Sequence, residues 1–336
     1  MDWFQALTGF REGSYRETQA KLFVDGDRLH SAVNGRSYRI GSLGLVSLEA
    51  LRERATSASQ PGRLKVSIVE GDVGKMHKAP EYAGAMFQVA SQFNLLEMVS
   101  PEITPEHGVT RYQHDRTQSP ACAIAAGAAT IYRNYFVSVA GGYGQSAKEQ
   151  LNALADLGET LSVALGQPQH ELWTMQNGYA LCSRRGLKSI AKYLETLKPT
   201  ARDRLIGRLR IGLHQDVEVT TTSQSPGPRV SQAFCSALPV AYSDVPQNEW
   251  KEFACLILEA AYEATLLAGL FNAQRGNSNI VLLTFLGGGA FGNHESWIYS
   301  AMRRAISRVS DVNLDVRLVS FGVPPQAFSQ LAGEFM

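Results

Sequence analysis

Ile280-Val281-Leu282-Leu283-Thr284-Phe285-Leu286, followed by Gly287-Gly288-Gly289-Ala290-Phe291-Gly292-Asn293, is the stretch that decides the fold of this chain. The first seven residues form a largely apolar run that is typical of a buried strand, and a helical pattern begins near Glu295. Glycines allow positive φ angles and a close approach of the backbone, so successive N–H groups can converge on an anion beside a helix N-terminus. We therefore predict a strand, a loop that suits a pyrophosphate, and a helix. A tight turn that needs glycine for packing alone is the alternative.

The glycine-rich loop differs from the common nucleotide-binding motifs. No Gly-Lys-Ser or Gly-Lys-Thr follows it, which excludes a Walker loop. The spacing of its glycines is not that of a Rossmann fingerprint followed by an acidic residue about 20 positions later.

The composition limits the class of protein and of partner. The chain has 336 residues, of which 44% are hydrophobic and 19% charged, as in an ordinary globular protein with one large or two modest domains. A formal net charge of +1 gives no global field for nucleic acid or anionic lipid, so we expect neither as a partner. No leader sequence and no uninterrupted apolar run of about 20 residues is present, which predicts a soluble, cytoplasmic protein. Neither the cysteines nor the histidines show a metal-ligand spacing, so we expect no metal and no cofactor.

Apolar runs alternate with longer helical segments from Leu64 onward, which predicts an α/β layer structure with a mostly buried sheet. The expected strands are 64–69, 85–90, 135–139, 209–220, 230–238, 280–286 and 314–321, and the expected helices are 121–132, 147–165, 187–197, 248–270 and 295–309.

The first 60 residues have a different pattern, with short alternating segments between 15 and 55. The turn signals Asp25-Gly26-Asp27 and Asn34-Gly35 separate these segments and predict a small antiparallel meander. A capped helix near 47–52 and a polar linker at 57–62 end it. We expect an N-terminal extension at 1–60 and the main domain at 61–336.

The apolar strand, the Gly-Gly-Gly-Ala-Phe-Gly loop, the helix and the terminal strand resemble the last third of a macrodomain. The loop is especially similar to that of poly(ADP-ribose) glycohydrolases. The resemblance implies a three-layer α/β/α fold with a mixed central sheet. It also implies that Gly287, Gly288, Gly289, Ala290, Phe291, Gly292 and Asn293 contact the diphosphate and distal ribose of ADP-ribose.

Two upstream segments carry the same resemblance. Val66 to Lys75, with Gly71-Asp72-Val73, is similar to the first strand and turn of macrodomains, which implies that Asp72 and Val73 contact the adenine. Gly71-Asp72 as a mere turn and helix cap is the alternative. The segment Phe87 to Asn94 is similar to a second strand and implies that Asn94 lies beside the proximal ribose. After Asn94 this sequence departs from the family, because neither a Gly-Gly-Gly nor a Gln-Glu-Glu signature follows.

This sequence has a capped helix N-terminus in the region where the family has the glycine loop that is missing here. Thr117, Gln118 and Ser119 precede an alanine-rich helix, so a phosphate can sit there. Gln118 is a candidate to hold a ribose hydroxyl or a water, and Tyr112 is a candidate to cover the sugar. The alternative to a phosphate site is that the small residues of this helix serve close packing alone.

Four carboxylates lie between the expected ribose strand and this helix. Cleavage at the anomeric carbon passes through an oxocarbenium-like transition state, which needs carboxylates to stabilise positive charge, activate water and protonate the leaving group. We rank Glu106 and Asp115 first as catalytic groups, then Glu97, then Glu102, because the first two lie closest to the capped helix in sequence. The alternative to a catalytic role is that each of these carboxylates is simply a solvated charge on a loop.

The resemblance covers about residues 64–322, with a helical insertion near 143–208. It implies a macrodomain ADP-ribosyl hydrolase of a glycohydrolase-like or bacterial-effector-type branch. Such an enzyme removes mono-ADP-ribose from an ADP-ribosylated protein, and we expect an arginine linkage, with ubiquitin as one possible partner. A non-catalytic reader that only binds ADP-ribose is the alternative, and a poly(ADP-ribose) glycohydrolase is a weaker one.

Overall fold

A central sheet of seven strands organises the described part of the molecule. The computed structural model describes residues 1–58, 62–115 and 117–335. Within them the strand order is β4-β11-β12-β6-β13-β14-β5. The five strands from β12 to β5 are parallel, whereas β4 and β11 run antiparallel to their neighbours, so the sheet is mixed. Its strands are β4 (Ser42–Ser47), β5 (Lys65–Glu70), β6 (Met86–Ala90), β11 (Arg210–Glu218), β12 (Arg229–Cys235), β13 (Ile280–Leu283) and β14 (Asp315–Ser320).

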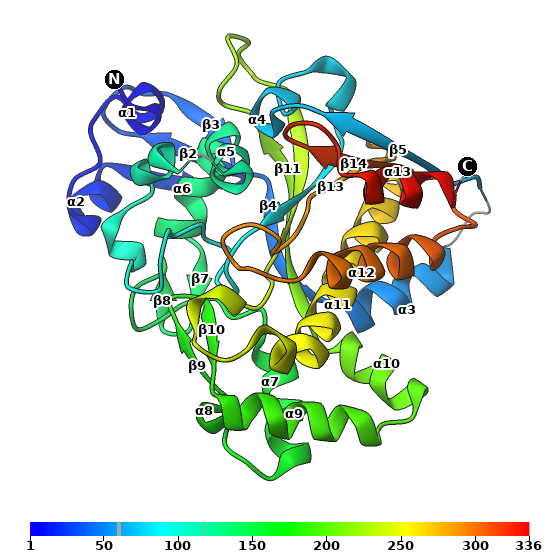
Figure 1. The fold of residues 1–336 in the computed structure, drawn as a ribbon. Helices are drawn as coiled ribbons and strands as arrows, with labels where there is room; N and C mark the ends of the chain where they lie inside the picture. Colours follow the sequence, from blue (N-terminus) through cyan, green and yellow to red (C-terminus); the bar gives the residue numbers. More distant parts are fainter. Residues whose placement is uncertain (59–61, 116, 336) are drawn as a thin grey trace.

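Helices cover both faces of the sheet (Figure 1). Alternate strand residues serve the two cores, since Val281 and Leu283 pack in one apolar cluster and Leu282 in the other. The expected three-layer α/β/α arrangement with a mixed sheet is confirmed. One face carries α3 (Leu48–Ala58), α11 (Gln247–Gln274) and α12 (Glu295–Ser307), and the other carries α4 (Val73–Met76), α5 (Gln118–Ala125) and α6 (Gly127–Tyr135).

Helix α11 is the longest helix of the described chain and passes through the larger core. By length and composition alone it is apolar enough to cross a membrane, but 89% of its most apolar window is buried inside the protein. A core helix accounts for that composition. The last helix is α13 (Gln326–Gly333), which the sequence pattern did not predict.

The expected N-terminal meander is present as the sheet β1-β2-β3, formed by Leu22–Asp25, Arg28–Ser31 and Ser37–Arg39. Two short helices, α1 (Trp3–Thr8) and α2 (Tyr15–Ala20), precede it. The next strand differs from expectation, because β4 leaves the meander and pairs with β11 at the edge of the central sheet. The N-terminal segment therefore contributes one strand to the main sheet. The boundary at 60 stays a prediction, and the linker at 57–62 lies largely outside the described residues.

The region expected to be a helical insertion also contains a hairpin. It includes α7 (Ala155–Leu165), α8 (Gln169–Leu172), β9 (Trp173–Gln176), β10 (Tyr179–Cys182), α9 (Arg184–Thr196) and α10 (Pro199–Gly207). Strands β9 and β10 pair antiparallel, and the sequence pattern did not predict them.

Three predicted elements differ in extent. The strand at 135–139 is wrong, because α6 continues to Tyr135 and only β7 (Ser138–Val139) pairs, with β8 (Gly142–Tyr143). The helix at 121–132 begins earlier and breaks at Ala126, which has ψ 57°. The helix at 147–165 begins only at Ala155, because the preceding segment is bonded to the turn after β6 through Ala153 N and Phe93 O at 2.8 Å. Four single 3₁₀ turns complete the described elements: Pro80–Tyr82, Pro105–His107, Thr110–His114 and Val240–Tyr242.

Candidate active site

A cleft of about 420 Å³ opens at the carboxyl ends of the parallel strands. The residues that follow β6, β12, β13 and β14, together with those that follow β5, line it. This edge of an open α/β sheet is where ligands generally bind. The walls include Val73, Ser91, Glu97, Asp115, Gln118, Ser119, Tyr179, Tyr242, Thr284, Phe291 and Phe321.

The glycine-rich segment forms one wall of the cleft. Strand β13 ends at Leu283, earlier than predicted, and the loop turns at Gly287 and Gly292, with φ angles of 76° and 69°. The Asn293 carboxamide closes the loop by donating to the carbonyls of Leu238 and Gly287, at 2.8 and 3.2 Å. Among the described residues, the N–H groups of Gly289, Ala290 and Phe291 donate to no protein atom, and these three residues line the cleft.

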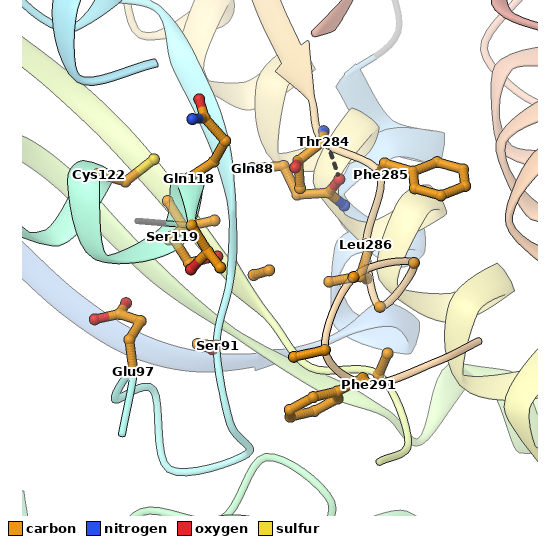
Figure 2. Close-up of a pocket in the computed structure, with 18 of the residues that line it drawn as sticks. Gln88, Ser91, Glu97, Gln118, Ser119, Cys122, Thr284, Phe285, Leu286 and Phe291 are labelled. Atoms are coloured by element: carbon orange, nitrogen blue, oxygen red, sulfur yellow. Dashed lines mark hydrogen bonds between the residues drawn. The ribbon is translucent and has the colours of Figure 1, made fainter. Parts of the chain in front are cut away.

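The N-terminus of α5 forms another wall of the cleft. Thr117 is the N-cap residue, and its side chain makes no capping hydrogen bond. The Gln118 side chain accepts a hydrogen bond from Val73 N at 3.0 Å, which ties α5 to the segment after β5. Figure 2 shows Glu97 and Ser119 on one side of the cleft and Phe285, Leu286 and Phe291 on the other. The cleft therefore lies between the glycine-rich loop and the N-terminus of α5.

A tightly bonded turn after β6 presents Glu97. The Gln92 carboxamide accepts from Met98 N at 2.8 Å and donates to Met98 O at 3.1 Å, which closes the turn. Leu95 has a φ of 66°, which a residue with a side chain rarely adopts. Its side chain fills space beside β11 that is open only because residue 212 is glycine.

The Glu97 carboxyl group is buried and has no hydrogen-bond partner. Its residue is 4% exposed, both carboxyl oxygens lack a partner among the described residues, and Arg133 Nη2 lies 4.0 Å from Oε1. Burial raises the pKa of Glu97 to about 8, against the opposing effect of Arg133, and Asp115 adds to the rise. Burial therefore favours the acid form of this carboxyl group at neutral pH, and the residue that carries it lines the cleft.

Asp115 supplies a second carboxylate to the same cleft. Its Oδ1 accepts a hydrogen bond from Thr117 N at 2.8 Å, next to the start of α5. It is partly exposed, whereas Glu97 is buried. The two carboxyl groups thus lie in contrasting environments, the arrangement that separates an acid from a base.

The structure places the other two predicted carboxylates away from the cleft. Glu106 is exposed and accepts hydrogen bonds from Ala147 N at 2.9 and 3.0 Å. Glu102 is exposed, and a hydrogen bond from Ser100 lowers its pKa. Neither residue lines the cleft, so closeness in sequence to α5 does not order these groups.

Several predicted ligand contacts lie behind the cleft wall. Asp72 caps α4 by accepting from Lys75 N, while its neighbour Val73 lines the cleft. Asn94 is buried and bonded to Gln150, and Tyr112 is buried with its hydroxyl accepting from Glu97 N at 3.1 Å. Gly292 and Asn293 shape the glycine loop from behind. Of the predicted ligand contacts, the cleft is lined by Thr117, Gln118, Ser119, Gly287, Gly288, Gly289, Ala290 and Phe291.

The sequence pattern missed three features of the site. Tyr179 from β10 packs on Phe291 with ring centroids 5.4 Å apart, and Tyr242 packs on both, so the insertion forms part of the wall. Phe321 follows β14 at the mouth of the cleft and is 66% exposed. Arg133 lies beneath Glu97; a charged residue in the apolar pattern of 126–135 is the signal that marks it. Within the described residues no group of side chains suits a metal ion.

The comparisons with known proteins find remote structural likeness only. No family model and no curated protein matches the chain. The poly(ADP-ribose) glycohydrolase from Thermomonospora curvata aligns over 96% of this chain and 96% of its own, with 12% identity and a TM-score of 0.44. That from Deinococcus radiodurans in complex with ADP-ribose covers 88% and 96%, with 11% identity and a TM-score of 0.47. At these values neither structure establishes a family or a function for this chain.

Proposed function

We propose that this protein is a hydrolase that binds an ADP-ribosyl group in the cleft and cleaves the bond at its anomeric carbon. The observation that carries the proposal is the Glu97 carboxyl group. It is buried in the cleft, unpartnered at both oxygens and protonated at neutral pH, and it lies across from a glycine loop with free N–H groups. Glu97 therefore replaces Glu106 as the first catalytic candidate.

The order of the strands suggests how the ligand lies. Val73 and Phe321 follow the neighbouring edge strands β5 and β14, where the exposed aromatic face of Phe321 can stack on adenine. The diphosphate then lies between the glycine loop and the N-terminus of α5, where N–H groups and a helix dipole favour an anion. The distal ribose lies toward β6 and β12, next to Glu97.

Two carboxyl groups in different environments, one buried and one partly exposed, suit hydrolysis of a glycosidic bond. As the bond between the anomeric carbon and the leaving atom breaks, Glu97 gives its proton to that atom. The oxygen of a water molecule bonds to the anomeric carbon, and Asp115 accepts the proton that the water loses. Proton exchange with solvent then restores both groups.

The proposal also covers the amino acid to which the ADP-ribosyl group is linked and the protein that carries it. An arginine-linked mono-ADP-ribosyl group fits the mechanism, because the departing guanidine nitrogen takes the proton of Glu97. ADP-ribosylated protein, ubiquitin included, is the first substrate to assay, and poly(ADP-ribose) is the second.

The first experiment pairs calorimetric titration of ADP-ribose with release assays on arginine-linked ADP-ribosyl protein and on poly(ADP-ribose). We expect binding in the wild type, and release that falls about 100-fold or more in Glu97→Gln and in Asp115→Asn while binding persists. Glu195→Gln and Asp25→Asn, at exposed positions far from the cleft in sequence, are the matched controls and should leave release unchanged.

The other outcomes separate the alternatives. Binding without release from either substrate would favour a reader. If ADP-ribose does not bind, the assignment of the glycine loop is wrong.

A further inference from the structure

We propose that Arg133 is a positioning residue for Glu97: it fixes the turn that carries this carboxyl group and supplies a positive charge beneath it without occupying its oxygens. The inference rests on the proposed function, since it assigns a role within the same site. It concerns a side chain that lies outside the cleft lining and that no ligand would touch.

The guanidinium of Arg133 is held in one orientation. The residue lies on α6, is fully buried, and stacks on Phe234 with 3.9 Å between the guanidinium carbon and the ring centroid. Its Nη2 donates to Thr130 Oγ1 at 2.9 Å and its Nη1 lies 3.3 Å from His214 Nδ1. A planar guanidinium group that is hydrogen-bonded on several sides and stacked on an aromatic ring has little freedom to move.

One bond from this guanidinium supports the turn directly. Arg133 Nε donates to the carbonyl of Leu95 at 3.2 Å, and Leu95 is the residue with the positive φ angle. A strained residue persists only when its surroundings hold it, and Arg133 is part of what holds this one. Because Leu95 precedes Glu97 by two residues, the bond also sets where the carboxyl group points.

The charge of Arg133 acts on Glu97 through space. At 4.0 Å from Oε1, Nη2 is beyond hydrogen-bond distance, since its bond to Thr130 draws it away. Both carboxyl oxygens thus stay without a hydrogen-bond partner. A closed ion pair would instead hold the carboxyl group ionised and remove the proton that it has to donate.

Other groups face the same carboxyl group. Asp115 stands on the segment before α5, Tyr112 on the preceding 3₁₀ turn and Cys122 on α5. Arg133 is the cation among them, and it opposes the rise in the Glu97 pKa that burial and Asp115 cause. His214 on β11, whose pKa is held far below its usual range by burial and then by Arg133, adds no second charge.

The test measures the Glu97 pKa directly, by ¹³C NMR titration of glutamate-labelled protein, with the signal assigned by its loss in Glu97→Gln. In Arg133→Met we expect the pKa to rise by about one unit or more, because the stabilising charge is gone. In Thr130→Val the guanidinium is released from its hydroxyl partner and can close on Glu97, so we expect the pKa to fall. Thr8→Val, a buried threonine whose hydroxyl bonds to its own helix, is the matched control and should leave the pKa unchanged.

Release assays over pH give the functional reading. The loss of activity at high pH should move upward in Arg133→Met and downward in Thr130→Val, because the acid form of Glu97 is the active one. Arg133→Lys keeps the charge but loses the bond to Leu95, so we expect kcat to fall about 10-fold with KM little changed.

The two proposals fail in different ways. If the folded Thr130→Val and Arg133→Met proteins keep the wild-type Glu97 pKa, the role of Arg133 is wrong. If the pKa shifts as expected but the wild type releases no ADP-ribose, the role of Arg133 stands and the hydrolase is wrong. Thr130→Val conserves shape, so it decides the matter even if Arg133→Met does not fold.

Discussion

At the scale of single residues, the sequence pointed to the acidic segment, but the order in which we ranked its members differs from their order of burial. Glu97, Glu102, Glu106 and Asp115 look equivalent in the sequence, and all lie within one segment. Burial distinguishes them, because only Glu97 is enclosed without a hydrogen-bond partner. That enclosure depends on Arg133 and on the space beside Gly212, which are far from Glu97 in sequence and could not be paired with it from one chain alone.

Glu97 should make stability depend on pH in a defined window. Its folded pKa of about 8 lies above the ordinary value of 4.5, so its contribution is fully present below pH 4.5 and is lost as the pH rises to about 8. Glu97→Gln keeps the shape without the charge. The variant and the wild type should unfold with similar free energies at pH 4.5, and the variant should be more stable by on the order of 3–5 kcal/mol at pH 9.

Urea denaturation of both proteins at the two pH values checks this expectation. The difference in free energy of unfolding between variant and wild type at each pH isolates the contribution of the Glu97 carboxyl group. A difference that is equal at both pH values would contradict the raised pKa. This measurement needs no ligand and is independent of the proposed reaction.

At the scale of elements, the parallel strands were predictable and the insertion was not. Strands β6, β12 and β13 are mostly buried on both faces, whereas β5 and β14 also carry partly exposed residues, and each of the five lies near its expected place. The hairpin β9-β10 is too short to show a period, and the position of Tyr179 against Phe291 depends on tertiary packing. The N-terminus of α5 was predictable because capping residues precede an alanine-rich run.

The glycine loop should tolerate a methyl group at one position and not at another. At Gly287 the φ angle is 76° and a Cβ would lie 2.5 Å from the Cβ of Ala237. At Gly289 a Cβ would meet nothing within 4 Å. We therefore expect Gly287→Ala to lower the free energy of unfolding by about 1–3 kcal/mol and Gly289→Ala to change it by less than about 0.5 kcal/mol.

Chemical denaturation measures both variants, and calorimetry with ADP-ribose then shows whether the displaced loop loses the ligand. We expect at least about 10-fold weaker binding in Gly287→Ala. Equal stability of the two variants would show that the turn does not require the positive φ angle.

At the scale of the whole molecule, the N-terminal 40 residues brace the segment that carries the acidic residues. The third apolar core joins Phe4, Leu7 and Leu29 to Leu96 and Tyr112. This contact joins the meander to the acidic segment, whereas the sequence predicted only an N-terminal extension. The sequence could not predict this contact, because Phe4, Leu7 and Leu29 are far from Leu96 and Tyr112 along the chain.

Glu12 is the polar part of this brace, and its loss should be measurable. Its carboxylate accepts hydrogen bonds from Val109 N at 2.9 Å, Thr110 N at 2.7 Å and the Tyr135 hydroxyl at 2.7 Å. Glu12→Gln removes the charge and turns a donor toward these donors, so we expect a loss of about 1.5–3 kcal/mol in the free energy of unfolding. Glu17→Gln, at an exposed glutamate bonded to Ser14, is the control and should change stability by less than about 0.5 kcal/mol.

Thermal and urea unfolding compare the two variants, and the release assay shows whether the acidic segment shifts. Equal stability of Glu12→Gln and Glu17→Gln would show that the brace is apolar only.

The strand order also bears on how the chain acquires its structure during synthesis. Strand β4 pairs with β11, so that Ser47 meets Arg210, and β5 pairs with β14, so that Lys65 meets Asp315. An early segment thus leaves the ribosome long before the strand that it needs, and pairings this distant in sequence form slowly. Strand β4 stays unpaired until β11 emerges at residues 210–218, and β5 stays unpaired until β14 emerges in the last fifth of the chain. We expect ribosome-bound fragments that stop before residue 280 to need a chaperone, and the cleft to appear only in the final step of folding.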